Sequence, residues 1–401
     1  MAQHTANKNR RRFLKDAGSL GLMAAMPGAM LPSLAKGQTM PKMEMAPSTP
    51  LNIAKPSRAV RFGVCGMSHD HIYGMAEAMV RGGGELVSVY ASEPERGAAF
   101  IKRFPQAKLV ATEDAVLNDP SLLLVLSSQV PSERARIGIR ALRQGKNYLS
   151  DKPGILTMAQ LAEVRKTVAE TGKIYAIMYS ELLEVPAAVQ AGYLVQAGAI
   201  GKVIQTINIA PHQINQRKGM AGGGAGRPDW FWDPARNGGI LADIGSHQVE
   251  QFLFYTGCTQ AEVVASQVAN VRHPDHPQFQ DFGDMMLHGN HGFGYVRLDW
   301  FTPYGLGTWG DGRLFILGTD GYIELRKYAD IAGRKGGNHL FIVDKDSARY
   351  MDCNNVPLPF GPQFIADVAN GTHVAQDQTQ CLLAAELVIR AQDKATHAKI
   401  A

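Results

Sequence analysis

The sequence predicts an α/β protein in two parts. Residues 58–180 are expected to form an N-terminal Rossmann-like domain with a doubly wound parallel sheet, and residues 181–401 a C-terminal α+β domain with a large, mostly antiparallel sheet. Three observations support this fold class. Short apolar strands alternate with helices through the first part, strands dominate after residue 260, and a length of 401 residues suits two domains.

The residues before position 58 are expected to lie outside both domains. Residues 1–35 combine the basic stretch NRRRFLK with a short apolar segment and a small-residue cleavage pattern, which is typical of a twin-arginine signal peptide. Residues 36–57 lack periodicity and are expected to be a linker or arm. We therefore expect export through the twin-arginine translocation machinery to the periplasm or another exported location. No stable membrane anchor is expected, because no second apolar run is long enough to span a bilayer.

The composition argues against a nucleic-acid partner. The formal net charge is +5, but the first 35 residues hold five of the 41 basic residues and only one of the 36 acidic residues, which leaves +1 for the rest. Cys65, Cys258, Cys353 and Cys381 show no CxxC spacing, so neither a zinc cluster nor a redox pair is predicted. A disulfide between Cys258 and Cys353 stays open.

The first predicted strand, residues 59–65, leads into an altered dinucleotide loop. In the pattern G-x-G-x-x-G, Gly66 is kept, whereas Ser68 and His71 take the places of the second and third glycines. His69 and His71 stand just before a predicted helix. We favour contact with phosphate or substrate for them over an incidental role, and place a metal site last, so no metal ligands are predicted.

Two later strands end at residues that are placed to contact a dinucleotide. Residues 85–90 lead into Ser92 and Glu93, close to where NAD enzymes keep an acid for the ribose hydroxyls. No acid stands at the strand end itself, and this weakly favours NADP over NAD. A fully apolar strand further on ends at Ser127 and Ser128, and ligands of open parallel sheets bind at such carboxyl ends.

The chemistry is expected at two further motifs. A short strand ends at Asp151-Lys152-Pro153, where the lysine can hydrogen-bond a substrate oxygen and stabilise charge that develops there. Residues 237–257, NGGILADIGSHQVEQFLFYTG, predict a glycine turn followed by an amphipathic helix. Asp243 and His247 are four residues apart, so they share one helix face, and the carboxylate can orient the imidazole for proton transfer. Taken alone, each motif also occurs as a plain surface turn or a helix start.

The order of these motifs resembles the Gfo/Idh/MocA oxidoreductase family, in which a Glu-Lys-Pro lysine and an Asp-x-x-x-His pair meet at the nicotinamide. The resemblance covers roughly residues 58–396. It implies Lys152, Asp243 and His247 as catalytic residues, with Asp151 in place of the usual glutamate. It also implies a homo-oligomer and a bound NAD or NADP, held by the residues Gly66, Ser68, His69, His71, Ser92, Glu93, Ser127, Ser128, Asp151 and Lys152.

Aromatic residues in the second half suggest a carbohydrate ligand. Trp230 follows a glycine-rich loop beside Arg227, and exposed aromatic faces near His212 can stack on a sugar ring. We name His212 and Trp230 as substrate contacts. Packing of these aromatic residues against the sheet or in a subunit interface is the alternative.

The sequence therefore predicts an exported NAD(P)-dependent oxidoreductase, a dehydrogenase acting on the CH–OH group of a sugar, cyclitol or related polyol. A compartment without a free nicotinamide pool requires a tightly bound cofactor that is restored within each cycle, so redox-neutral turnover is expected. The first alternative is an NAD-dependent glycoside-cleaving enzyme, lyase or epimerase of the same fold. The second is a non-catalytic carbohydrate-binding relative whose nucleotide loop has degenerated.

Overall fold

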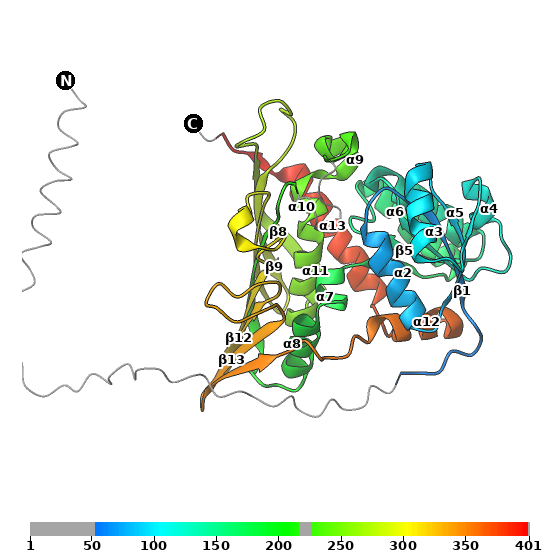
Figure 1. The fold of residues 1–401 in the computed structure, drawn as a ribbon. Coiled ribbons are helices and arrows are strands. Elements are labelled where there is room, and N and C mark those ends of the chain that lie inside the picture. The colour runs from blue at the N-terminus through cyan, green and yellow to red at the C-terminus, as the bar shows by residue number, and fades with distance from the viewer. Residues whose placement is uncertain (1–52, 216–225, 400–401) are drawn as a thin grey trace, which may run out of the picture. The chain divides into compact units, whose positions relative to one another are not determined.

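The computed structural model describes residues 53–215 and 226–399, which build two sheets with a layer of helices between them (Figure 1). One sheet is wholly parallel and the other is mostly antiparallel, so the predicted fold class is confirmed. The predicted signal peptide and most of the predicted arm lie outside the described residues.

The first sheet contains six parallel strands in the order β3-β2-β1-β4-β5-β6. Every residue of β4 and β5 is buried, as expected for a parallel sheet with both faces covered. The strand order reverses between β1 and β4, which is where open sheets of this kind bind ligands. The strands are β1 (Arg61–Met67), β2 (Glu85–Tyr90), β3 (Lys108–Leu109), β4 (Leu124–Ser128), β5 (Asn147–Asp151) and β6 (Tyr175–Met178).

The helices that connect these strands begin and end at residues suited to helix termini. In α6, the Thr157 hydroxyl accepts a hydrogen bond from the Gln160 N–H at 3.1 Å, and Gly172 ends the helix with a φ of 62°. Pro131 stands at the first position of α5, where a missing N–H costs nothing. The helices are α2 (His71–Arg81), α3 (Pro94–Arg103), α4 (Glu113–Leu117), α5 (Pro131–Arg143) and α6 (Met158–Thr171).

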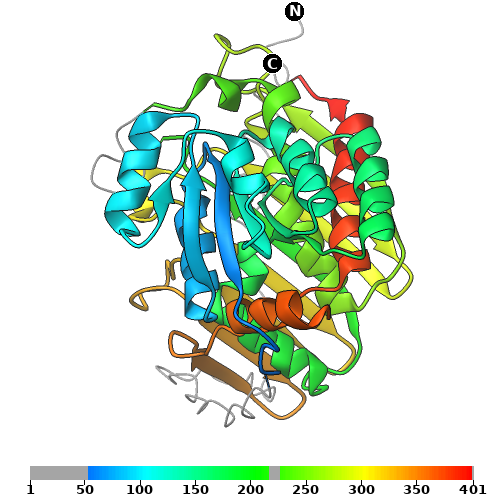
Figure 2. The same cartoon turned by 90° about the vertical axis from the view of Figure 1, so that its right-hand side faces the viewer.

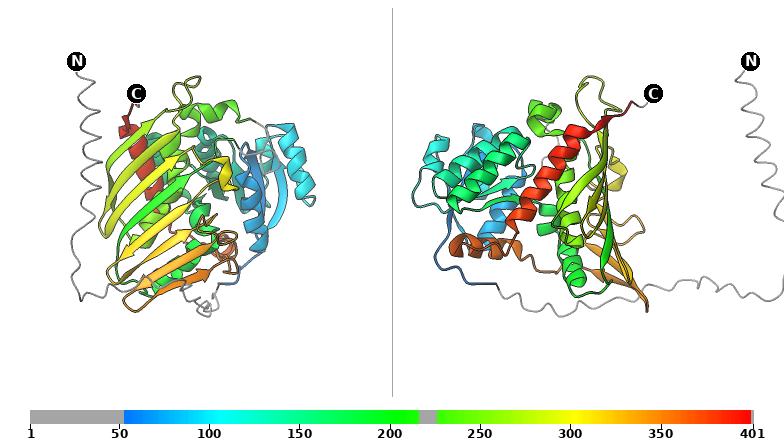
Figure 3. Two further views of the ribbon diagram at one scale, coloured as in Figure 1. Left: turned by 60° about the vertical axis from the view of Figure 1, so that its left-hand side comes forward. Right: turned by 180° about the vertical axis from the view of Figure 1, so that it is seen from behind.

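The second sheet contains nine strands in the order β14-β13-β12-β11-β7-β10-β9-β8-β15. Only the pairs β7–β10 and β8–β15 are parallel. Buried and more exposed residues alternate along the central strands, and Figure 3 shows that no described α-helix covers the outer face. The strands are β7 (Val203–Pro211), β8 (Ala261–Ala269), β9 (Phe282–Gly289), β10 (Gly292–Asp299), β11 (Arg313–Gly318), β12 (Gly321–Arg326), β13 (His339–Asp344), β14 (Ala348–Asp352) and β15 (Thr396–His397).

The helices of the second half cover the inner face of this sheet and also reach the first sheet. α11 and α13 pack on the inner face, while α12 returns to lie beside α2 at the end of the six-stranded sheet (Figure 2). The two halves therefore share buried apolar clusters. The elements are α7 (Ser180–Leu183), α8 (Pro186–Gln196), η1 (Asp229–Trp232), α9 (Pro234–Asn237), α10 (Gly239–Asp243), α11 (Gly245–Thr256), η2 (Tyr304–Leu306), α12 (Phe360–Asn370) and α13 (Gln378–Lys394).

The segment that carries Asp243 and His247 is two helices, so the prediction of a single helix was wrong. Helix α10 ends at Asp243, and α11 starts at Gly245 after one intervening residue. The break coincides with a close approach to the large sheet, because a Cβ added at Gly245 would lie 2.8 Å from the end of the Met285 side chain. The expected glycine turn and glycine cap are confirmed by the positive φ angles of Gly238, Gly239 and Gly257, which are 93°, 75° and 67°.

The structure also answers two questions raised by the sequence, whether Cys258 and Cys353 form a disulfide and whether a helix could span a membrane. All four cysteines are buried and carry free thiols, so the disulfide between Cys258 and Cys353 that the sequence left open is not formed. In the part of the chain that the structure describes, none of the helices combines the length and the apolar character that a membrane span requires.

Candidate active site

A cleft of about 660 Å³ lies at the carboxyl edge of the six-stranded sheet, where the loops after its strands meet the second half of the chain. It brings together eight of the residues predicted from the sequence: Ser68, His69, His71, Lys152, His212, Trp230, Asp243 and His247. Six other predicted site residues do not line it, namely Gly66, Ser92, Glu93, Ser127, Ser128 and Asp151.

Lys152 and Asp243 form an ion pair that joins the two halves of the chain. The Lys152 Nζ lies 2.9 Å from the Asp243 Oδ1, and the two residues are 91 positions apart in the sequence. Burial opposes ionisation of the carboxyl group, but Lys152, His69 and His212 together outweigh that penalty and lower the pKa of Asp243. The lysine is 5% exposed, lines the cleft and bonds this one carboxylate among the described residues, so its ammonium group has further N–H donors for a ligand.

His247 lies in the same cleft as a buried, neutral imidazole. Burial holds the pKa of His247 well below its ordinary value, although the nearby Glu181 opposes the shift. Within the described residues its Nδ1 has no hydrogen-bond partner. The predicted orientation of His247 by Asp243 is therefore not seen. Asp243 instead bonds Lys152, which extends from the end of β5.

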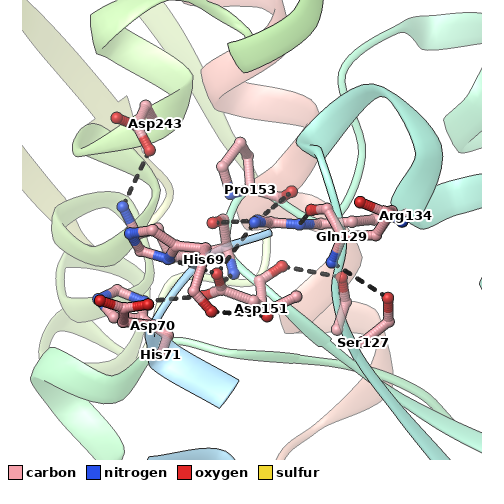
Figure 4. Close-up of polar contacts among 12 residues, drawn as sticks. His69, Asp70, His71, Ser127, Gln129, Arg134, Asp151, Pro153 and Asp243 are labelled. Atoms are coloured by element: carbon pink, nitrogen blue, oxygen red, sulfur yellow. Dashed lines mark hydrogen bonds and ion pairs between the residues drawn. The ribbon is translucent and has the colours of Figure 1, made fainter. Parts of the chain in front are cut away.

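Asp151 is the centre of a buried network behind the cleft (Figure 4). One carboxylate oxygen lies 2.9 Å from the His69 Nδ1 and 3.0 Å from the Arg134 Nη2, and the other lies 2.9 Å from the His71 Nδ1. The Lys152 N–H also donates to Asp151 at 2.7 Å. Burial opposes the charge, but Arg134 and the two histidines outweigh it and hold the pKa of Asp151 well below its usual range.

The charge of Asp151 fixes how the two histidines are protonated. An ionised carboxylate only accepts hydrogen bonds, so both Nδ1 atoms must carry a hydrogen, and Nε2 is the acceptor in each neutral ring. Burial and the neighbouring His71 lower the pKa of His69 to about 4. In this state the His69 ring has no donor left for a phosphate, so the predicted phosphate contact would need a protonated ring.

In residues 53–215 and 226–399, one group of side chains has the spacing of metal ligands: His69, His71 and Asp151, whose possible ligand atoms lie within 4.8 Å of one another. Those atoms already bond one another, and the Arg134 guanidinium binds the same carboxylate. A cation would have to displace these donors from Asp151. We therefore assign the group a positioning role.

The loop after β1 retains features that suit a dinucleotide. Gly66 has a φ of 86°, and an added Cβ would lie 2.9 Å from the Gln129 side chain, so the position requires glycine. The N-terminus of α2 has no side-chain cap, and its Ile72 and Tyr73 N–H groups donate to the His69 and Asp70 carbonyls at 3.3 and 3.2 Å. The Ser68 N–H donates to the Ser128 carbonyl at 2.9 Å, which ties the loop to the end of β4. The described residues therefore fit a bound dinucleotide despite the two lost glycines.

The predicted serine contacts have mainly structural partners. Ser127 and Ser128 are fully buried, and the Ser128 hydroxyl donates to the His69 carbonyl at 2.7 Å. The Ser68 hydroxyl lies 3.1 Å from a Glu93 carboxylate oxygen, and Ser92 accepts a hydrogen bond from the Gln129 side chain at 3.3 Å. These bonds fix the edge of the sheet, with Glu93 exposed at its rim.

An aromatic wall on the other side of the cleft surrounds His212. Its ring centroid is 4.7 Å from Trp309 and 5.4 Å from Trp300, and burial lowers the pKa of His212 to about 4. Trp230 packs edge-on to His69 at 6.5 Å, so it spans from this wall to the histidine loop. Neutral rings beside aromatic faces suit the stacking and hydrogen bonding of a sugar.

Two charged residues of the site were missed in the sequence. Glu181 lines the cleft and bonds Lys327 at 2.8 Å; burial opposes its ionisation, but Lys327 and its neighbours lower the pKa of Glu181 to about 2. Its position shortly after the buried strand β6 was a usable signal. Arg134 lies on the buried face of α5. The local sequence does not identify it as a site residue, because its partner Asp151 lies on strand β5.

Two sequence families match the chain. Residues 60–179 match the oxidoreductase family with an NAD-binding Rossmann fold, and residues 189–324 match the Gfo/Idh/MocA C-terminal domain. The chain is 25% identical over 210 residues to 1,5-anhydro-D-fructose reductase from Ensifer adhaerens and 24% identical over 134 residues to D-xylose dehydrogenase from Paenarthrobacter nicotinovorans. These matches cover 51% and 33% of this chain and only 59% and 34% of those relatives.

Solved structures extend the similarity over most of the chain. A structure from Erwinia carotovora atroseptica SCRI1043 shares 42% identity with a TM-score of 0.80, and the match covers 85% of this chain and 100% of that one. A 3-ketoreductase from Actinomadura kijaniata in complex with NADP has the same fold at 18% identity, with a TM-score of 0.65 over 85% of this chain and 99% of that one. Together with the two family matches, this similarity establishes that the chain belongs to the Gfo/Idh/MocA family of oxidoreductases.

Proposed function

We propose that this protein is an exported NAD(P)-dependent oxidoreductase that acts on a CH–OH group of a sugar, cyclitol or related polyol. The observation that carries the proposal is the Lys152–Asp243 pair at 2.9 Å, which lines one cleft with the buried neutral imidazole of His247. The names of the two curated relatives, a sugar reductase and a sugar dehydrogenase, support a carbohydrate substrate.

Each of the three residues has a distinct task in this proposal. His247 accepts the proton of the reacting hydroxyl, because its ring is neutral near pH 7 and lines the cleft. Lys152 donates a hydrogen bond to the same oxygen and stabilises the negative charge that develops there. Asp243 holds the ammonium group in place through the ion pair.

The cofactor would be held at the edge of the six-stranded sheet by the loop at Gly66 and Ser68, the N-terminus of α2, and the rim residues Ser92 and Glu93. A nicotinamide bound there supplies the hydride acceptor or donor for the reaction. His69 and His71 would complete this side of the site from their fixed positions on Asp151.

The setting of the enzyme is part of the proposal. The twin-arginine pattern of residues 1–35 supports export to the periplasm or a similar compartment, and such a compartment favours a tightly bound cofactor and redox-neutral turnover. A homo-oligomer is supported by the outer face of the large sheet, where Met286 and Phe293 are 52% and 50% exposed.

One observation favours a second candidate, transient oxidation followed by elimination, glycoside cleavage or epimerisation. Such reactions need a further base to remove a proton from carbon. The His71 ring centroid lies 6.4 Å from that of His247, and its Nδ1–H is held by Asp151, so its Nε2 is left as an acceptor near the reacting group.

The test begins with mass spectrometry of the ligand released when the exported, purified protein is denatured. We expect NAD or NADP at about one per chain, and reduction of the bound nucleotide, followed by absorbance, when a panel of sugars and polyols is added. Protein that is empty and binds neither nucleotide would contradict the proposal and favour a carbohydrate-binding protein. Products that have lost a glycosidic bond or changed configuration, with no net nucleotide change, would favour the second candidate.

A further inference from the structure

The charged residues that line the cleft are almost all paired. Lys152 bonds Asp243 at 2.9 Å, and Arg134 bonds the buried Asp151 at 3.0 Å. The other pairs are Arg96 with Asp70 and Glu93, at 2.9 and 3.0 Å, and Glu181 with Lys327, at 2.8 Å. Each acid that lines the cleft therefore has a basic partner.

Arg227 is the exception. Among residues 53–215 and 226–399 no carboxylate lies within ion-pair distance of it, and the ten residues that precede position 226 contain no acid. The Nε donates to the Ile214 carbonyl at 2.6 Å, and Nη2 donates to the Gln213 carbonyl at 3.2 Å. The side chain is thus anchored by neutral groups and adds one uncompensated positive charge to the cleft.

The guanidinium group is held in a fixed plane. It lies over the Phe231 ring at 4.5 Å and over the Trp300 ring at 5.1 Å. Burial lowers the pKa of Arg227, but a guanidinium group stays charged in proteins. With Nε and Nη2 engaged, Nη1 has no acceptor in the described part of the chain and remains for a ligand.

The free charge suits a singly charged carboxylate. A largely buried cation without a counter-ion is costly, and the remaining Nη1 can donate a charge-assisted hydrogen bond to a carboxylate oxygen. Within residues 53–215 and 226–399, Arg227 is the one lysine or arginine of the cleft without an ion-pair partner, and a single positive charge matches a monoanionic carboxylate better than a dianionic phosphate. Gln213 beside it is 3% exposed, and its Oε1 has no donor within the described residues, so it can accept a hydroxyl next to the carboxylate.

Arg227 makes its direct contacts away from the loop at Gly66, although Asp70 in that loop is near enough to raise its pKa against the effect of burial. Its partners Gln213, Ile214, Phe231 and Trp300 all come from the second half of the chain, whereas the loop at Gly66 belongs to the first. Resting on the function proposed above, we propose that Arg227 binds a carboxylate of the substrate, and that the substrate class is an acidic polyhydroxy compound such as a uronate or aldonate.

The experiment compares matched acid and neutral ligands on the purified full-length protein with its nucleotide loaded. The pairs are D-glucuronate with D-glucose and D-gluconate with D-glucitol, and binding is measured by calorimetry, so no turnover is needed. One charge-assisted hydrogen-bond pair predicts that the acid binds about 10- to 100-fold more tightly. A neutral ligand that binds as tightly as its acid would overturn the inference.

Two variants and a control assign that preference to Arg227. Arg227→Met should bring the acid-to-neutral ratio close to one, and Arg227→Lys should restore only part of it, because an ammonium group lacks the planar fork. Arg272→Met, an exposed arginine outside the cleft, should keep the wild-type ratio. A full acid preference in Arg227→Met would also contradict the inference. If that variant does not fold, the ratio in the wild type still decides.

The outcomes separate this inference from the proposed function. If Arg227→Met instead loses bound nucleotide, as read by mass spectrometry, the anion is a cofactor phosphate and the substrate assignment is wrong. If acids bind through Arg227 but no nucleotide is ever reduced, the proposed function fails and the carboxylate site stands.

Discussion

Asp151 and Lys152 are consecutive residues, yet their side chains have opposite surroundings. Asp151 is 1% exposed and accepts hydrogen bonds from His69, His71, Arg134 and the Lys152 main chain. Lys152 turns the other way, lines the cleft and has Asp243 as its one carboxylate partner. Asp151 therefore faces the interior with its acceptor positions occupied, whereas Lys152 faces the cleft with N–H donors that a ligand can use.

The difference indicates a division of roles: the Asp151 network positions the main chain, and Lys152 takes part in the reaction. The Asp151 network joins the loop after β1, helix α5 and the end of β5, so it fixes the main chain from which Lys152 extends. A saturated carboxylate cannot bind substrate without breaking these bonds. The Lys152–Asp243 pair can accept one more partner without losing its own contact. The following predictions test this division, from the largest expected effect to the smallest.

The largest effect is expected from Lys152→Met. Removing the donor that stabilises the developing charge should lower kcat by about 10³-fold, the upper range for loss of one such donor. Folding should be retained, because the freed Asp243 side chain is 18% exposed and can be hydrated. Single-turnover measurements with the bound nucleotide give the rate, and thermal unfolding checks the fold.

The exposed Lys166→Met on α6 is the matched control, since the Lys166 side chain is 62% exposed. It should leave the rate unchanged. A Lys152→Met enzyme with a wild-type rate would remove Lys152 from the reaction and end the proposed division.

The second effect is on stability and comes from Asp151→Asn. The change leaves the Arg134 guanidinium, 1% exposed, without its counter-charge, and breaking a buried pair in this way typically costs about 3 kcal/mol or more. Urea unfolding measures the loss. Asp151→Glu keeps the charge and should recover most of the stability, less about 1 kcal/mol or more for the extra methylene in a packed site. Equal stability of Asp151→Asn and wild type would show that the network is not structural.

A feature could be predicted from the sequence when the residues that form it lie close together along the chain. The strands and helices were predictable because apolar periodicity is local, and the cleft position followed from where parallel strands end. Lys152, Asp243 and His247 do line one cleft, as their motif order suggested.

The failures have physical reasons of the same kind. The spacing of Asp243 and His247 predicts a shared helix face only if the helix is unbroken, and the break before Gly245 depends on packing against a sheet formed later in the chain. The burial of Arg134 and of Glu181 depends on partners 17 and 146 residues away, which no local pattern reveals. The two serines at the end of β4 are buried, because that strand is buried on both faces.

The third prediction concerns pH and tests whether His69 is held neutral. Its pKa is about 4 in the folded state and the ordinary value is 6.5, so between these values the unfolded chain binds a proton that the folded chain does not. Stability should therefore fall as pH falls from 6.5 toward 4. From pH 7 to pH 5 the loss of stability attributable to His69 should be about 1–2 kcal/mol. We expect a value near the lower end of this range, because the His69 ring is 26% exposed.

Urea unfolding at the two pH values measures this loss. His69→Gln keeps a side chain that can donate to Asp151 and should reduce the loss on acidification, whereas the exposed His397→Gln should not. An unchanged pH dependence in His69→Gln would mean that the ring is charged in the folded protein and that Asp151 faces two cations.

The smallest effect concerns the rim, where Glu93 lies between the network and solvent. Its carboxylate accepts from Ser68 at 3.1 Å and pairs with Arg96 at 3.0 Å. In Glu93→Ala the negative charge is lost and Arg96 is released, and both changes favour a ribose 2'-phosphate over a hydroxyl. The ratio of the Kd values for NADH and NADPH should shift toward NADPH by about tenfold, equivalent to about 1.4 kcal/mol.

Fluorescence titration of nucleotide-free protein measures both constants, and Glu95→Ala, an exposed acid on the same turn, is the control. Because Glu93 is exposed and Arg96 also bonds Asp70 at 2.9 Å, the fold should tolerate the change. An unchanged ratio would show that the ribose does not reach this rim. The bond from Ser68 to Glu93 would then serve only to extend the structural network from Asp151 toward the surface.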